Sequence, residues 1–124
     1  MSHHFSRGLF QSAAPFSHAC RVGDLWFISG IIGQRRDTGE LVSTELGLQA
    51  RTMFDNLDLL LDELGVRPAG IARTCLYLTD YADFDELNVI YAERIESPYP
   101  ARTTLETAAL PLGAKVQIDA IARA

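Results

Sequence analysis

The sequence contains no apolar stretch long enough to cross a membrane. No apolar run approaches about 18 residues, and the N-terminus lacks the basic region and apolar core of a secretory signal. Cysteine is also scarce: Cys20 and Cys75 are the only two, and they lie far apart in apolar surroundings. This usage favours reduced, buried thiols over a disulfide scaffold. We therefore expect a cytoplasmic protein.

Clusters of basic residues are missing as well. Eleven basic residues face sixteen acidic ones, which leaves a net charge of −5, and the pair Arg35-Arg36 is followed at once by Asp37. Nonspecific binding to nucleic acid depends on clustered Lys and Arg. The charge pattern therefore argues against a nucleic-acid partner.

Histidines are few and do not have the spacing of metal ligands. His3 and His4 are adjacent, and His18 has no ligand partner at a recognisable distance along the chain. We predict neither a metal nor a cofactor.

The composition is that of one globular domain spanning residues 1–124. Hydrophobic residues make up 48% and charged residues 22% of the chain. A chain of this length can bury a core without disulfides or metals.

Strands are predicted by β-forming residues between turn signals. Ser17–Val22 and Leu25–Gly30 form a hairpin around Gly23-Asp24, and the nearly continuous apolar character of the second strand predicts a central strand covered on both faces. The other predicted strands are 9–14, 71–78, 103–107 and 116–122.

Two helices are predicted from apolar residues at helical spacing. The first runs from Leu46 to Leu64, with Ser43 or Thr44 as its cap and Gly65 as its stop, and the second runs over 83–95. Asp83 and Glu86 have the spacing of a capping box at the start of the second helix. The polar face of the first helix, which includes Arg51, Asp55, Asp58 and Asp62, is interpreted as a solvated surface.

This order of elements predicts an α+β fold in which the helices cover one face of a mixed, mostly antiparallel sheet. We expect a mixed polar and apolar set on the other face: Arg102, Thr104, Gln117, Asp119 and Ile121. Such a face is too apolar to be fully solvated and too charged for a dry core. It therefore predicts packing against further copies of the chain around a wet cleft.

Arg102 is the first candidate for binding a ligand. Period-2 geometry places Thr104 on the same side of the strand, and a guanidinium matches both oxygens of a small carboxylate. From these residues alone, a surface arginine on an edge strand is the alternative interpretation.

Several motifs, in this order and spacing, resemble the RidA family over nearly the whole chain. They are Ala14-Pro15-Phe16-Ser17, Phe27-Ile28-Ser29-Gly30, Thr38-Gly39-Glu40, Gln49-Ala50-Arg51 to Asn56-Leu57, Asp83-Phe84 to Asn88 and Tyr91, Tyr99-Pro100-Ala101-Arg102, and Val116 to Ala122.

The resemblance implies a chorismate-mutase-like fold that forms a homotrimer with clefts between subunits. It also implies cofactor-independent hydrolysis of enamine and imine acids, such as 2-aminoacrylate and 2-iminopropanoate, to a 2-oxo acid and ammonium, which detoxifies reactive metabolites. Arg102 looks like the family arginine that pairs with the substrate carboxylate. The chain departs from the family pattern at Phe16, Ile31, Thr104 and Asp119, where Tyr, Gln, Cys and Glu are common.

We therefore predict an imine deaminase in which Asp119 and Thr104 are catalytic. Asp119 deprotonates a water with the help of Thr104. The predicted substrate-binding residues are Phe16, Gly30, Asn88 and Arg102, although Asn88 taken alone has the pattern of a surface amide. Two alternatives stay open: a module that binds small carboxylates without turnover, and a ribonuclease, which the acidic balance disfavours.

Overall fold

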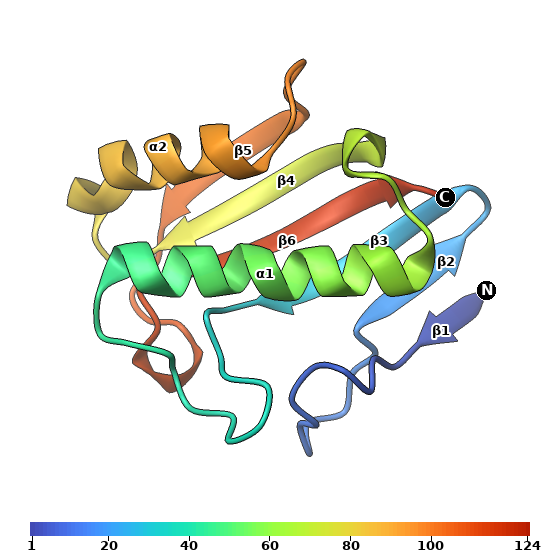
Figure 1. Cartoon of the computed structure of the whole chain (residues 1–124), viewed down its shortest axis with the longest axis horizontal. Helices are drawn as coiled ribbons and strands as arrows, with labels where there is room; N and C mark the ends of the chain where they lie inside the picture. Colours follow the sequence, from blue (N-terminus) through green and yellow to red (C-terminus); the bar gives the residue numbers. More distant parts are fainter.

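Two helices cover one face of a six-stranded sheet (Figure 1). In the computed structural model, which describes residues 1–124, the strand order is β1-β2-β3-β6-β4-β5. Only β4 and β5 are parallel neighbours. The strands are β1 (Ser2–His4), β2 (Ala19–Val22), β3 (Leu25–Ile31), β4 (Ile71–Leu78), β5 (Ala101–Glu106) and β6 (Val116–Arg123). The predicted α+β architecture is confirmed.

The β2–β3 hairpin turns at Gly23, whose φ of 59° suits a residue without a Cβ. β3 lies between β2 and β6, as its apolar sequence predicted. However, the chain covers only one face of this strand. Leu25 and Phe27 point away from the helices and are 39% and 43% exposed. The expectation of cover on both faces is therefore wrong for a single copy.

Helix α1 (Leu46–Leu64) has the predicted bounds, and Gly65 ends it in the left-handed conformation with a φ of 69°. Its predicted cap is wrong. Glu45 occupies the N-cap position and makes no side-chain cap bond. The Ser43 hydroxyl instead accepts a hydrogen bond from the Glu45 N–H, so it orders the turn before the helix.

Helix α2 (Phe84–Arg94) is one residue shorter at each end than predicted, and the predicted capping box does not form. Asp83 has helical backbone angles and no side-chain cap bond. The capping carboxylate is that of Asp80, which accepts from the Ala82 N–H and starts the short 3-10 turn η2 (Tyr81–Asp83). The chain therefore enters α2 through a turn that comes earlier than the sequence pattern suggested.

The N-terminal region also differs from the prediction. Residues 9–14 form a loop instead of a strand, whereas Ser2–His4 form the edge strand β1. The Gln11 side-chain amide donates to the carbonyls of Ser6 and Leu9, which fixes the loop locally. These side-chain bonds satisfy carbonyls that a strand would pair with a neighbour.

The core lies between the helices and the sheet. Its apolar side chains come mainly from one stripe of α1 and from the helix-facing positions of β4 and β6. They include Met53, Phe54, Leu57, Leu60, Leu76, Leu78, Val116 and Ile118, all at most 1% exposed. Truncating a buried leucine of this kind to alanine typically costs about 2–5 kcal/mol. This layer holds the sheet rigid beneath the candidate site.

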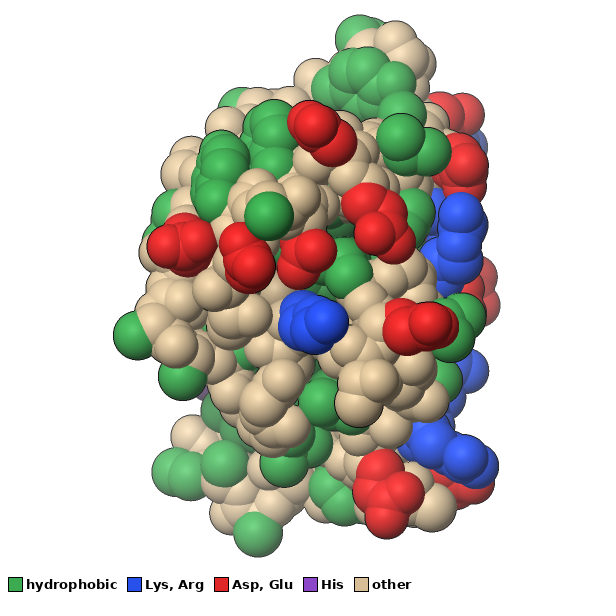
Figure 2. Space-filling view, turned by 90° about the vertical axis from the view of Figure 1, so that its left-hand side faces the viewer, with side chains coloured by type: hydrophobic (Ala, Val, Ile, Leu, Met, Phe, Trp, Pro, Cys, Tyr) green, Lys and Arg blue, Asp and Glu red, His purple; other side chains and the backbone are tan.

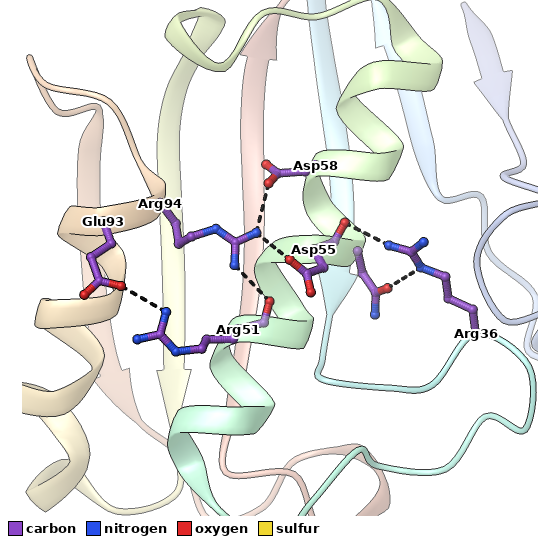
Figure 3. A network of polar contacts seen from close by, with 7 residues as sticks. Arg36, Arg51, Asp55, Asp58, Glu93 and Arg94 are labelled. Carbon is purple, nitrogen blue, oxygen red and sulfur yellow. Dashed lines mark hydrogen bonds and ion pairs between the residues drawn. The ribbon is translucent and has the colours of Figure 1, made fainter.

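The polar face of α1 is more than a solvated surface. Arg94 of α2 donates to Asp55 and Asp58 at 2.6 and 3.0 Å, and Arg51 reaches back to Glu93 of α2 at 2.9 Å (Figure 3). These contacts join the two helices on the side away from the sheet.

Neither α1 nor α2 combines the length and the apolar character that a bilayer-spanning helix needs.

Candidate functional site

The predicted site residues lie on two opposite sides of the sheet. In the parallel β4–β5 register Thr104 pairs with Leu76, which is fully buried beneath the helices. Arg102 and Thr104 therefore point toward the helix side. Asp119 pairs with Cys75 and points toward the open side.

The prediction that Arg102, Thr104 and Asp119 share one face is therefore wrong. Period-2 alternation fixes which residues share a face within one strand, and it assigned Gln117, Asp119 and Ile121 correctly to one side of β6. It does not fix the register between β5 and β6, which β4 separates.

Arg102 lies at the sheet edge in an aromatic setting. Its guanidinium carbon is 4.4 Å from the ring centroid of Tyr91 and 5.7 Å from that of Phe84, both on α2. Its Nε donates to the Thr104 hydroxyl at 2.8 Å. A cation held over ring faces and by one hydrogen bond has a fixed orientation. Thr104 therefore orients the arginine in this chain, which differs from the predicted role beside Asp119.

Two buried side-chain polar atoms have no hydrogen-bond partner, and both belong to predicted binding residues: Nη2 of Arg102 and Oδ1 of Asn88. Burial lowers the pKa of Arg102, which marks a partly desolvated cation without a counter-ion. Buried polar groups are nearly always paired, so an unpaired donor of this kind suits an anionic ligand. We call Arg102, Thr104, Asn88, Phe84 and Tyr91 the arginine site.

Tyr91 and Phe84 were not predicted as site residues, because their helical spacing indicates core packing. The Tyr91 hydroxyl shares a 2.8 Å hydrogen bond with the buried Thr74 hydroxyl, which fixes the ring under the guanidinium. Phe84 lies four residues before Asn88 and Tyr91 lies three residues after it, on adjacent turns of one helix. This spacing is the sequence signal that marks the two aromatic residues.

Asp119 lies on the open side with Tyr77. The Tyr77 hydroxyl donates to Asp119 Oδ2 at 2.7 Å. The nearby Cys75 thiol, followed by the hydrogen bond to Asp119, raises the pKa of Tyr77. The carboxylate is therefore fixed at one oxygen, while Oδ1 has no partner among the side chains around it. Tyr77 was also missed, because only the strand register brings it to Asp119.

Gly30 and Phe16 line a cavity of about 560 Å³ on the same side of the sheet as Asp119. We call it the apolar cavity. β3 bulges here: between the pairs Ile28–Ala120 and Ile31–Ile118, the two residues Ser29 and Gly30 face the single residue Asp119 of β6. A Cβ on Gly30 would lie 2.6 Å from Nε2 of Gln117, so the glycine leaves room for that amide at the cavity wall.

Charge is unevenly spread over the surface. On the side of the molecule shown in Figure 2, acidic side chains are scattered across the face and basic ones gather toward its right-hand edge. Several of the basic residues are paired with acids, as Arg35 is with Asp37 and Arg94 with Asp55. No cluster of three His, Cys, Asp or Glu side chains has the arrangement of a metal site.

Residues 8–124 match the protein family described as Endoribonuclease L-PSP. The chain belongs to this family, which includes the RidA proteins. The resemblance predicted from the motifs is confirmed.

Several curated relatives carry deaminase names. The chain is 38% identical to Reactive Intermediate Deaminase A, chloroplastic, of Arabidopsis thaliana over 108 residues, 87% of this chain and 58% of the plant protein. The chain therefore spans less than two thirds of that relative. It is 34% identical to the human 2-iminobutanoate/2-iminopropanoate deaminase, over 87% of this chain and 79% of the human protein.

The fold has a near match among solved structures. RidA from the Antarctic bacterium Psychrobacter sp. PAMC 21119 superposes with a TM-score of 0.94 at 29% identity, and the match covers the whole of both chains. The sheet with two helices on one face is therefore the RidA fold.

Proposed function

We propose that this protein hydrolyses small 2-imino acids and their enamine tautomers to 2-oxo acids and ammonium. The observation that carries the proposal is the buried Nη2 of Arg102, an unpaired cationic donor that Thr104 and Tyr91 hold in one orientation. A substrate carboxylate would supply the missing counter-ion. The deaminase names of two relatives support the same chemistry.

In the proposed reaction, Asp119 accepts a proton from a water whose oxygen attacks the imine carbon. The substrate reacts as the protonated imine, so this attack gives a neutral carbinolamine, and Asp119 then returns its proton to the nitrogen. The C–N bond breaks as the C=O bond forms, and the released ammonia takes the hydroxyl proton, so one water is consumed and one ammonium is released. Tyr77 holds Asp119 through Oδ2, which leaves Oδ1 to act as the base. Because the substrate carries its own electrophilic carbon, the protein needs to supply only position and proton transfer.

Arg102 and Asp119 of one chain point to opposite sides of the sheet, so we propose that a complete site forms between copies. β5 is an edge strand, which places Arg102 where a second copy can approach. The open side of the sheet exposes apolar residues such as Phe27 and Leu105, at 43% and 37%. A contact repeated from the edge of one copy to the open side of the next forms a closed ring when the rotation between copies is a simple fraction of a turn, and we propose a ring of three copies.

The test is the release of 2-oxo acid from freshly generated 2-iminopropanoate, compared with buffer alone. Arg102→Ala is expected to raise KM strongly, because the carboxylate loses its charged partner. Arg67→Ala is the matched control, since Arg67 is exposed in the turn after α1. A wild-type rate equal to that of buffer, across several imino acids, would refute the proposal.

Assembly is tested separately by sedimentation at several protein concentrations. A trimer is expected, and Phe27→Asp, on the exposed open side, should dissociate it and abolish turnover together. A monomer with full activity would contradict the shared site.

A binding module without turnover is the second candidate. The observation in its favour is the hydrogen bond from the Tyr77 hydroxyl to Asp119, which occupies one oxygen of the proposed base. Calorimetry with 2-oxo acids separates the two functions. Tight binding that depends on Arg102, without hydrolysis, identifies the module.

A further inference from the structure

The wall of the apolar cavity carries no charged side chain. Its apolar part is formed by Phe10, Phe16, Ile32 and Leu112, and its polar part consists of neutral groups such as Ser29 and Gln117. At about 560 Å³ it lies within the usual range for small-molecule sites. The methyl side chain of 2-iminopropanoate fills only a small part of that space. A neutral wall of this size suits a larger, uncharged group.

Leu112 is the unusual member of this wall. It has a φ of 59°, in the left-handed region where leucine is rare and where Gly, Asn or Asp are preferred. It is also 61% exposed, so its side chain contributes little to the core. A strained backbone that gains no burial is a feature found at binding sites.

The turn around Leu112 keeps it in this conformation. The Gly113 N–H donates to the Leu110 carbonyl at 3.2 Å, and the Ala114 N–H donates to the Pro111 carbonyl at 3.0 Å. Ala114 is buried and thus anchors the turn η3 (Pro111–Gly113) to the body of the protein. The leucine side chain is therefore presented at the cavity by a fixed loop.

The apolar cavity is close to the proposed base. Gln117 lines the cavity and is two residues from Asp119 on the same face of β6, a separation of about 7 Å along a strand. A substrate whose imine carbon lies at Asp119 can therefore extend its side chain into the cavity.

We infer that the apolar cavity binds the side chain of the imino acid, and that Leu112 makes the protein selective for bulky apolar side chains, branched or aromatic, over methyl. This inference rests on the proposed function. It names the substrate class as the imino acids that two-electron oxidation of large apolar amino acids would supply.

The experiment measures kcat/KM for a series of imino acids generated in place by an amino-acid oxidase from alanine, 2-aminobutanoate, leucine and phenylalanine. The protein variants are wild type, Leu112→Asn and Leu48→Asn. Asparagine tolerates a positive φ, so Leu112→Asn removes the apolar group and keeps the turn. Leu48 is an exposed leucine on α1, at 48%, and is the matched control.

Wild type should favour the leucine-derived imine over the alanine-derived one by about tenfold or more, the scale of one well-packed methylene. Leu112→Asn should lower that ratio by about tenfold at an unchanged or higher melting temperature, and Leu48→Asn should leave the ratio as in wild type. Equal ratios in wild type and Leu112→Asn, or a wild-type preference for the methyl substrate, would overturn the inference.

The failure of the proposed function is distinguishable from the failure of this inference. If no imino acid is hydrolysed faster than in buffer, the deaminase proposal fails, and calorimetry with pyruvate and 4-methyl-2-oxopentanoate decides the selectivity. Tighter binding of the larger acid that is lost in Leu112→Asn supports the role of Leu112. Equal binding of the two acids contradicts it.

Discussion

Tyr77 donates a 2.7 Å hydrogen bond to Asp119 across the strands β4 and β6. The direct cross-strand partner of Asp119 is Cys75, so this bond runs diagonally to the next position on the same face. Because the pKa of Tyr77 is raised, its hydroxyl keeps the proton throughout the neutral range. The short aspartate side chain is therefore tied to the sheet at one oxygen, which limits where its other oxygen can point.

The first prediction concerns this bond. Tyr77→Phe keeps the ring and removes the donor, so Asp119 loses its fixed position. We expect kcat for 2-iminopropanoate to fall by about tenfold with little change in KM, because small displacements of a positioned base slow the reaction strongly.

A double-variant comparison shows whether Tyr77 acts only through Asp119. Asp119→Asn should cause the larger loss, and adding Tyr77→Phe to it should cause no further loss. If the two losses multiply, the positioning role is wrong.

The second prediction separates two glycines that are three residues apart. A Cβ on Gly30 would meet the flexible end of Gln117, whereas a Cβ on Gly33 would lie 2.3 Å from the backbone oxygen of Gln49 in α1. Gly30→Ala should therefore fold and displace Gln117 from the cavity wall, with a roughly tenfold lower kcat/KM. Gly33→Ala should lose about 3 kcal/mol of unfolding free energy, since the helix backbone cannot yield easily.

Urea unfolding and activity measured on both variants check this contrast. Gly30→Ala with unchanged turnover, or Gly33→Ala as stable as wild type, would show that the packing around these positions is looser than described.

The elements of the fold were predictable because their signals are local. Apolar spacing together with Gly65 gave both ends of α1, and Gly23 marked the hairpin. The errors came from side-chain bonds that compete with regular structure. The side chains of Ser43 and Asp80 accept hydrogen bonds from backbone N–H groups before the helices, so neither α1 nor α2 starts with the predicted cap.

The sequence marked individual candidate residues but not how they are arranged. Arg102 and Asn88 do carry the unpaired buried atoms, and Gly30 and Phe16 do share a cavity. Their division between two sides of the sheet depends on strand order, which a periodic pattern does not contain. For the same reason the sequence did not predict the contact between Tyr77 and Asp119, because that contact depends on the register between β4 and β6.

The third prediction concerns the contact between the helices. Arg94 is only 22% exposed, donates to both Asp55 and Asp58, and lies 5.7 Å from the Phe54 ring (Figure 3). Arg94→Ala should lower the unfolding free energy by about 1–2 kcal/mol, more than a surface pair usually contributes, because it also removes packing over the ring. Arg94→Lys keeps the charge but loses the planar fork, so it should recover only part of the loss.

Urea unfolding in low and high salt separates the charge contribution of Arg94 from its packing contribution. The charge part should shrink in high salt, and Arg67→Ala should change stability by less than about 0.5 kcal/mol. A loss of the same size for Arg67→Ala would show that the helix contact has no special contribution.

The fourth prediction concerns pH and His18. This buried side chain accepts a 2.9 Å hydrogen bond at Nδ1 from the Ser6 N–H, which requires that nitrogen to be unprotonated. Burial, followed by the nearby His4, lowers the pKa of His18, although Glu63 opposes the shift. The rings of Phe5 and Phe16 pack on its other sides. Because the folded-state pKa lies below the ordinary value, the stabilisation is present above about pH 6.5 and is lost as the pH falls.

Unfolding free energies between pH 7.5 and pH 5 should therefore decline in wild type. The decline should be smaller in His18→Asn, whose side-chain oxygen still accepts from Ser6 but does not titrate. His3→Asn, on the exposed strand β1, is the control and should keep the wild-type decline. If His18→Asn loses stability with falling pH as steeply as wild type does, the acid sensitivity arises elsewhere, and the buried acceptor at Nδ1 does not control it.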